Sequence, residues 1–168
     1  NTRLVGSEMC IRDRNLTLEE VKSPEPGAGQ VLIDVHAAGI NFPDVLTVQG
    51  KYQFKPSLPF TPGIEVSGVI KKVGKDVKMR KVGDEVISTL QTGAFASEVV
   101  TSENSTFLKG NMSFEQAAGF ALTYGTSYYA LKQRARLVAG ETVLVLGAAG
   151  GVGVATIQLA KAMGANVI

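Results

Sequence analysis

Apolar and polar side chains alternate before residue 113 in a way that predicts short β-strands. In QVLIDVHAAGIN, Val31, Ile33 and Val35 occupy every second position and Leu32 falls on the opposite face, which is the period of a half-buried strand. FPDVLTVQG then predicts a short helix that ends at Gly50, and strand patterns return in GIEVSGVIKKVG, VGDEVIST and GAFASEVV. Many short strands separated by glycines are typical of a compact, barrel-like β domain.

The pattern changes to helical periods at Ser113. Ser113 and Gln116 have the spacing of a capping box, and TSYYALKQRARLV predicts a further helix. ETVLVLG is an uninterrupted apolar run, typical of a strand in a parallel sheet that is covered on both faces. GAAGGVG leads into a helix over ATIQLAKAMG that closes at Gly164, and ANVI begins another strand. The order strand, glycine loop, helix, strand predicts a βαβ unit.

The loop GAAGGVG, residues 147–153, has the backbone chemistry of a pyrophosphate-binding turn. Its glycines allow positive φ and close approach of a ligand, and free N–H groups at the start of a helix attract anions. Compared with the pattern G-x-G-x-x-G, Ala148 replaces the first glycine, while Gly150 and Gly153 match. A tight turn that binds nothing is the alternative, but a position between strand and helix favours nucleotide binding.

The segment GETVLVLGAAGGVGVATIQLAK, residues 140–161, resembles the zinc-independent quinone oxidoreductases related to zeta-crystallin, within the medium-chain dehydrogenase/reductase superfamily. AAGINFPDVLTVQGKY and PFTPGIEVSGVIKKVGKDVKMRKVGDEV resemble the GroES-like catalytic domain of that superfamily. The resemblance covers residues 15–168 and implies an α/β protein. It implies a GroES-like β-barrel over residues 15–125, followed over residues 126–168 by the first βαβ unit of an incomplete Rossmann NAD(P)-binding domain.

The resemblance also implies NADPH as cofactor and a quinone or an α,β-unsaturated carbonyl as the small-molecule acceptor. NADH remains open, because the residue that selects the cofactor would lie about 20 positions past the glycine pattern, beyond residue 168. The alternatives are an enoyl-CoA or enoyl-ketone reductase on the same scaffold and a non-catalytic crystallin-like or nucleic-acid-binding role. We expect a cytoplasmic homodimer for the full-length protein, and an inactive fragment for this chain alone.

Three side chains are assigned to the site by the resemblance. Asn41 and Tyr52 are the catalytic candidates beside nicotinamide and acceptor, and Thr126 matches a threonine of the nicotinamide pocket. Each has a plainer alternative: Asn41 closing a strand, Tyr52 packing as a loop aromatic, Thr126 capping a helix. The predicted cofactor-binding set comprises Asn41, Thr126, Ala148, Ala149, Gly150, Gly151, Val152 and Gly153.

A zinc site is not expected. The positions of the zinc ligands in zinc-dependent members of the superfamily hold Asn41, Ile64 and an apolar stretch at residues 121–122 here. The carboxylate of Glu65 alone cannot supply the three protein ligands of a catalytic zinc. Without a Lewis acid, alcohol oxidation is disfavoured and reduction of an electrophilic acceptor is favoured.

Composition and charge exclude several classes of partner. The 168 residues carry a net charge of +2, which disfavours nucleic acid and anionic membranes. A single cysteine, Cys10, excludes an intramolecular disulfide and favours a reducing compartment. Residues 142–160 are uncharged and long enough to span a bilayer, but their four glycines favour a strand, a turn and a helix.

Residues 1–14 show neither a helical nor a strand period. LVGSEMCIRDR, residues 4–14, resembles a transposase sequencing adapter translated in frame. We therefore interpret residues 1–14, with Cys10, as a non-native segment; an ordinary disordered tail is the alternative.

Resequencing the source DNA through both ends of the reading frame tests this interpretation. We expect codons 4–14 to disappear and the frame to continue past residue 168 into further strand–helix units. A genomic origin of these codons, with a stop after residue 168, would contradict the prediction and make Cys10 a genuine residue.

Overall fold

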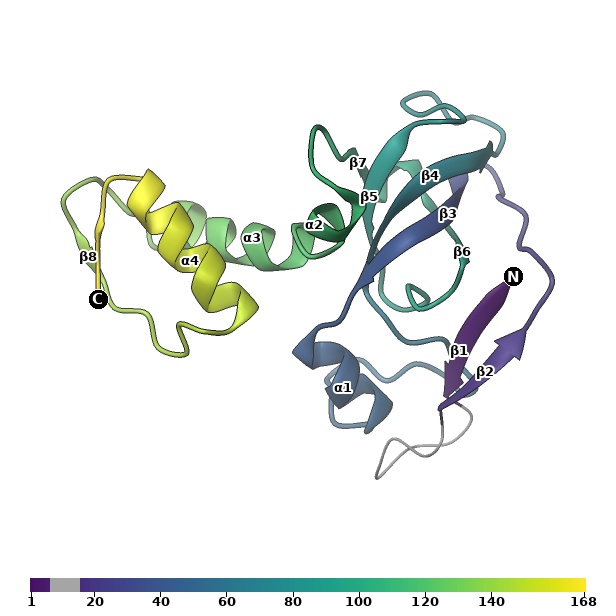
Figure 1. Cartoon of the computed structure of the whole chain (residues 1–168), viewed down its shortest axis with the longest axis horizontal. Helices are drawn as coiled ribbons and strands as arrows, with labels where there is room; N and C mark the ends of the chain where they lie inside the picture. Colours follow the sequence, from purple (N-terminus) through teal and green to yellow (C-terminus); the bar gives the residue numbers. More distant parts are fainter. Residues whose placement is uncertain (7–15) are drawn as a thin grey trace. The chain divides into compact units, whose positions relative to one another are not determined.

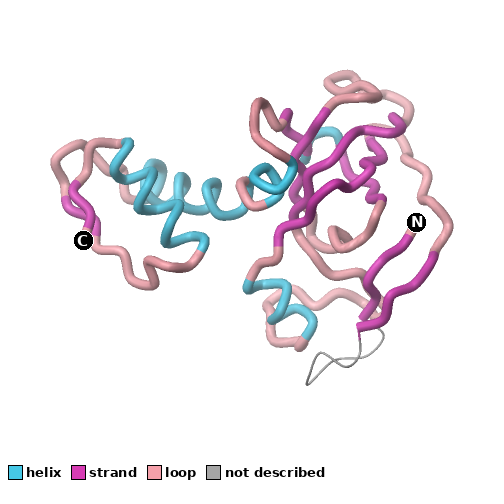
Figure 2. The backbone as a smooth tube through the Cα atoms, viewed as in Figure 1, coloured by secondary structure: helices cyan, strands magenta, loops and turns pink. Residues whose placement is uncertain are grey.

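The computed structural model of the chain describes residues 1–6 and 16–168. It divides into two compact units, Asn1–Gly119 and Phe120–Ile168, each of which is described by itself. The predicted division lay between residues 125 and 126, six residues later. The first unit consists mainly of strands and the second mainly of helices (Figure 2).

A five-stranded antiparallel sheet forms the centre of the first unit (Figure 1). Its edge strands β6 and β7 are separated in sequence only by the 3-10 turn Glu103–Ser105, so the sheet has to curl until its edges approach each other. The Ser88 hydroxyl of β5 lies 3.5 Å from the Thr101 hydroxyl of β6, the opposite edge strand, across this closure. The predicted barrel-like β domain is confirmed. In spatial order the strands are β6 (Glu98–Ser102), β3 (Gln30–Gly39), β4 (Glu65–Val73), β5 (Glu85–Thr89) and β7 (Thr106–Leu108).

The core of this unit lies against β3 and β4. Val31 and Ile33 are fully buried, as the alternating pattern predicts, and pack with Val66 and Ile70 of β4. Leu32 is also fully buried, which strict alternation does not predict. The register shift between Leu32 and Ile33 does not explain this burial, because the extra residue, Lys71, lies in β4 and β3 pairs with β6 without a shift. Leu32 is therefore buried on the face of β3 opposite Val31 and Ile33, outside their cluster.

Local capping signals set the helices of the first unit. The short helix α1 (Phe42–Val48) ends before Gly50, whose φ of +65° a glycine adopts without strain. Helix α2 (Phe114–Ala118) begins at Ser113. The Ser113 hydroxyl accepts from the Gln116 N–H at 3.2 Å, and the Gln116 side chain accepts from the Ser113 N–H at 3.1 Å. The predicted capping box is confirmed.

A two-stranded sheet joins the start of the chain to this unit. Strand β1 (Thr2–Gly6) pairs antiparallel with β2 (Leu16–Glu20), and Val5 is buried. The Leu4 N–H donates to the Phe95 carbonyl at 2.9 Å. The expectation of no strand in this segment is therefore wrong for residues 2–6, because backbone pairing forms a strand without an alternating side-chain pattern.

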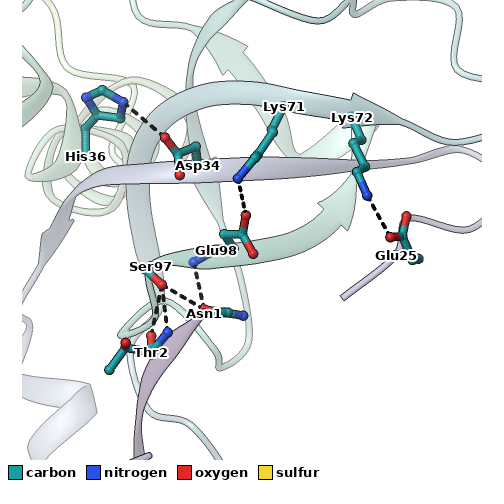
Figure 3. A network of polar contacts seen from close by, with 9 residues as sticks. All are labelled: Asn1, Thr2, Glu25, Asp34, His36, Lys71, Lys72, Ser97 and Glu98. Carbon is teal, nitrogen blue, oxygen red and sulfur yellow. Dashed lines mark hydrogen bonds and ion pairs between the residues drawn. The ribbon is translucent and has the colours of Figure 1, made fainter. Parts of the chain in front are cut away.

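Polar contacts at the first residue add to this pairing (Figure 3). The Asn1 side-chain oxygen accepts from the Ser97 hydroxyl at 2.9 Å and from the Glu98 N–H at 3.2 Å. Cys10 lies outside the described residues. The foreign origin of residues 1–14 stays a prediction.

The second unit contains the predicted βαβ arrangement. Two parallel strands, β8 and β9, flank helix α4, and helix α3 packs against α4. Gly164, with a φ of +81°, follows the end of α4 as predicted. No helix in the part of the chain that the structure describes is both long and apolar enough to cross a membrane. The elements are α3 (Ala121–Tyr128), a π-helical turn (Tyr129–Arg134), β8 (Thr142–Val143), α4 (Gly151–Ala162) and β9 (Asn166–Val167).

Strand β8 is much shorter than the apolar run ETVLVLG predicts. Only Thr142 and Val143 pair with β9, because a strand extends only as far as its ladder partner. The Val145 N–H still donates to the Ile168 carbonyl at 2.9 Å. Leu144 and Leu146 are 65% and 84% exposed, so this run is not covered on both faces within this chain.

The complete burial of Leu32 makes a stability prediction. Leu32→Ala should lower the free energy of unfolding by about 2–5 kcal/mol, since it leaves a cavity in a closed core. Leu108→Ala removes the same atoms from another side chain of the sheet, but Leu108 is 62% exposed. This substitution should change the free energy of unfolding by about 0.5 kcal/mol or less. Urea denaturation followed by circular dichroism measures both, and equal losses would contradict the assignment of Leu32 to the core.

Candidate active site and nucleotide-binding loop

The glycine loop lies at the N-terminus of α4. Gly150 is the N-cap residue and its N–H donates to the Gly147 carbonyl at 3.1 Å. The Val154 N–H closes the first helical turn on the Gly150 carbonyl at 2.8 Å. The N–H groups of residues 151–153 therefore have no acceptor within the helix. They border a hollow of about 450 Å³ that is lined by Leu144, Val145, Leu146, Gly147, Gly150, Gly151, Val152, Gly153 and Thr156.

The loop accepts alanine where the dinucleotide pattern has its first glycine. Gly147 carries the positive φ of +72°, and Ala148 is not among the residues with positive φ. The last glycine is required by crowding, because a Cβ on Gly153 would lie 2.9 Å from the Ala148 Cα. At Gly150 the nearest atom to an added Cβ would be the Gly147 carbonyl oxygen, at an ordinary 3.5 Å. The chain itself does not require glycine there, whereas close approach of a pyrophosphate would.

Thr126 is exposed and lies inside α3, in the same unit as the glycine loop. Helix α3 begins at Ala121 with Phe120 as its N-cap, so the alternative reading of Thr126 as a helix cap is wrong. Its expected place at the nicotinamide remains a prediction.

Asn41 connects the end of β3 to α1 and fixes a buried carboxylate. Its side-chain Nδ2 donates to Glu65 Oε1 at 2.9 Å, and Glu65 is 1% exposed at the start of β4. Its backbone N–H donates to Asp44 Oδ2 at 2.7 Å. Asn41 therefore does more than close a strand: it is the N-cap residue of α1 and holds Glu65.

Asp44 belongs to this cluster and was not among the predicted site residues. The Asn-x-x-Asp spacing from Asn41 to Asp44 is that of an N-cap and its third helical residue, so a capping-box search could have found it. Asp44 is 3% exposed, and among the described residues no hydrogen-bond partner reaches its Oδ1. It lines an apolar hollow of about 230 Å³ together with Leu16, Ile40, Val45, Val48, Gln49, Pro62 and Phe95.

Burial raises the pKa of the Asp44 carboxyl above its ordinary value. The hydrogen bond from the Asn41 N–H acts in the opposite direction, and the neighbouring Glu65 charge raises the pKa further. The ionised form of Asp44 is thus disfavoured in the folded chain.

Tyr52 follows α1 in a half-buried position. Its N–H donates to the Leu46 carbonyl at 3.2 Å, which ties the loop back to the end of the helix. Both the predicted contact with an acceptor and simple loop packing remain open for its side chain.

The donor chemistry of the first unit does not fit a catalytic zinc. Among residues 1–6 and 16–168, no three His, Cys, Asp or Glu side chains are grouped so that they could hold a metal ion. Ile64 has no donor atom, and Asn41 directs its amide nitrogen to Glu65.

The alcohol dehydrogenase GroES-like domain family matches residues 27–140. The chain belongs to this family. It is 43% identical over 146 residues to mouse quinone oxidoreductase-like protein 2, an alignment that covers 86% of this chain and 42% of that protein. The quinone oxidoreductase-like character recognised in the sequence, within the medium-chain dehydrogenase/reductase superfamily, is confirmed.

Solved structures agree with this assignment. Escherichia coli quinone oxidoreductase complexed with NADPH superposes with a TM-score of 0.94 at 34% identity, over 99% of this chain and 51% of that one. The CurK enoyl reductase superposes with a TM-score of 0.91 at 34% identity, over 99% of this chain and 53% of that one. The chain spans about half the length of the relatives it matches.

The raised pKa of Asp44 predicts a pH-dependent stability. Because the folded pKa lies above the unfolded value, the contribution of Asp44 is fully present below about pH 3.9 and is lost as the pH rises through the folded pKa. Asp44→Asn keeps an oxygen for the Asn41 N–H and removes the charge. The variant should therefore gain stability relative to the parent chain as the pH rises from 4 to 8.

Urea unfolding across this pH range measures the gain. Asp84→Asn is the matched control, because Asp84 Oδ2 also accepts a backbone N–H three residues earlier, from Lys81 at 3.0 Å. A gain of the same size in both variants would assign the effect to net charge and contradict the role of burial at Asp44.

Proposed function

We propose that this chain is part of an NADPH-dependent oxidoreductase that reduces a quinone or an α,β-unsaturated carbonyl without zinc. The glycine loop is the observation that carries the proposal. It offers unsatisfied N–H groups at residues 151–153, a hollow beside them, and a glycine at position 150 that the chain's own packing does not require. The quinone oxidoreductase relatives, one of them solved with NADPH, support the same assignment.

The loop residues fit the pyrophosphate of a dinucleotide. The N–H groups of Gly151, Val152 and Gly153 would donate to its oxygens, and the positive end of the α4 dipole would stabilise its charge by about 0.3–1 kcal/mol. Thr126 and Asn41 are the residues that we assign to the nicotinamide, on the family resemblance. When bound, NADPH supplies the hydride, and the protein supplies orientation and hydrogen bonds.

The acceptor side of the proposal rests on Asn41 and Tyr52. The bond from Asn41 to Glu65 holds the carboxamide in one orientation, which favours a positioning role at the reacting groups. The Tyr52 hydroxyl is assigned as a hydrogen-bond donor to the carbonyl oxygen of the acceptor. Reduction of an already electrophilic acceptor requires no Lewis acid, in keeping with a donor set that does not fit zinc. A homodimer, a cytoplasmic location and the absence of nucleic-acid and membrane partners belong to the same proposal.

An enoyl reductase is the second candidate, and the similarity to the CurK enoyl reductase favours it. The two functions differ in the acceptor alone. Turnover of NADPH with 1,4-benzoquinone, a simple enone and an enoyl-CoA should be compared in the protein encoded by the complete reading frame. We expect the quinone to give the highest kcat/KM, and a clear preference for enoyl-CoA would select the second candidate.

Titration of this chain with NADPH tests the loop directly. In ¹⁵N-labelled protein we expect weak, millimolar binding with amide shifts centred on residues 147–153, and no turnover of any acceptor. Gly153→Ala should abolish the shifts, because its Cβ would collide with Ala148. Gly125→Ala is the control, since a Cβ on Gly125 meets nothing within 4 Å.

Either of two results would contradict this expectation. Tight binding in calorimetry would show that this length of chain already forms a complete cofactor site. Changes in amide resonances that lie outside residues 147–153 would show that NADPH does not bind at the glycine loop.

A further inference from the structure

Two hydroxyl groups meet between α3 and the first two turns of α4, and the two helices lie side by side in the second unit (Figure 1). Ser127 is 1% exposed, and its Oγ lies 3.1 Å from Thr156 Oγ1 and 3.1 Å from the Val152 carbonyl oxygen. Thr156 Oγ1 lies 2.7 Å from the same carbonyl. Both hydroxyls thus converge on the carbonyl oxygen of one residue in the nucleotide-binding loop.

The hydroxyl protons can be distributed over this cluster in only a few ways. Each hydroxyl carries one proton, and Ser127 can also donate to the Thr123 carbonyl of its own helix at 2.8 Å. When Ser127 donates to Val152, Thr156 is free to donate to Ser127, and two hydrogen bonds then join the helices. Ser127 is 1% exposed, so water is kept from its hydroxyl, whereas Thr156 is half-buried and lines the hollow. The bond from the buried Ser127 hydroxyl is therefore the one that holds the carbonyl of Val152 against α3.

The fixed carbonyl also fixes the donor on its far side. The Val152 carbonyl and the Gly153 N–H belong to one planar trans peptide group and point in opposite directions. Holding the oxygen against α3 therefore turns the Gly153 N–H away from α3. Close packing of the loop on α3 supports the same orientation. A Cβ on Gly151 would lie 2.9 Å from Thr123 Cγ2, so the backbone at Gly151 lies close against α3.

We propose that Ser127 is a positioning residue for the nucleotide-binding loop, with Thr156 as its hydrogen-bonding partner. Ser127 acts through the Val152 peptide group, whose orientation aims the Gly153 N–H at the pyrophosphate. Ser127 does not line the hollow beside the loop, so its effect on binding is indirect. The inference rests on the proposed function, since it assumes that the loop binds a pyrophosphate.

The test compares Ser127→Ala with the parent chain, using inorganic pyrophosphate and NADPH as probes. Dissociation constants come from the shift of the Gly153 amide resonance in ¹⁵N-labelled protein. We expect Ser127→Ala to weaken binding of both probes by a similar factor of about three to ten, the worth of one net hydrogen bond. A purely structural role would lower the melting temperature without changing these constants.

Ser88→Ala is the matched control. Ser88 is another fully buried serine, which donates to the Ser105 carbonyl at 3.0 Å and lies 3.5 Å from the Thr101 hydroxyl, in the first unit. It should lower thermal stability and leave both dissociation constants unchanged. Weakening of the same size in Ser88→Ala would overturn the proposal.

Thr156 provides a second route to the answer if Ser127→Ala does not fold. Thr156→Ser keeps the hydroxyl and should bind both probes like the parent chain, whereas Thr156→Val loses it and should bind more weakly. Parent-like binding by Thr156→Val would overturn the proposal.

Failure of the positioning role of Ser127 and failure of the proposed function give different results in this experiment. If the parent chain shows loop shifts and Ser127→Ala binds both probes equally well, Ser127 is not a positioning residue and the proposed function stands. If neither probe shifts the loop amides of the parent chain at millimolar concentration, the proposed function and this inference are both overturned.

Discussion

The buried carboxylate of Glu65 constrains the whole end of the sheet where β3 leads into α1. A carboxylate that is 1% exposed needs donors, since burial without them costs several kcal/mol. Asn41 supplies one donor, and as the N-cap residue of α1 it also fixes where that helix begins. Gly39 leaves the necessary space, because a Cβ there would lie 2.5 Å from Glu65 Oε1 and from the Ala118 carbonyl oxygen. The Glu65 carboxylate thus contacts the end of β3 at Gly39 and the side-chain amide of Asn41, which is the N-cap residue of α1.

In the second unit, backbone N–H groups are the polar groups that need hydrogen-bonding partners. The first turn of α4 leaves N–H donors without acceptors in the helix, and the chain around them is packed so closely that their direction is fixed. Gly153 packs against the backbone of Ala148, and Gly151 packs against the side chain of Thr123, in each case with no room for a Cβ. The resulting candidate site is a set of oriented dipoles that requires no charged side chain. This explains why the Ala148 variant of the glycine pattern is tolerated: that residue shapes the turn without needing positive φ.

Features encoded by neighbouring residues could be predicted from the sequence, and features encoded by distant pairing could not. The capping box at Ser113 and the helix end at Gly164 each depend on a few consecutive residues, and both predictions were confirmed. The burial of Leu32 depends on what covers the second face of β3, and the shortness of β8 depends on the extent of its pairing with β9. The strand over residues 2–6 depends on pairing with β2. None of these partners is visible in the local pattern.

The candidate site also combines a feature that the sequence reveals with a contact between distant residues. This contact affects how Asn41 can be studied by mutation. The family resemblance identified Asn41 as a site residue. The hydrogen bond from Asn41 to Glu65 spans 24 positions, and no local sequence pattern predicts it. Because the amide nitrogen is directed to a carboxylate, Asn41→Ala would remove a donor from a buried charge, and Asn41→Asp would place a second carboxylate beside it. Either substitution disturbs the fold as well as the site. A loss of activity in such a variant therefore identifies a reacting-site residue only when stability is measured alongside it.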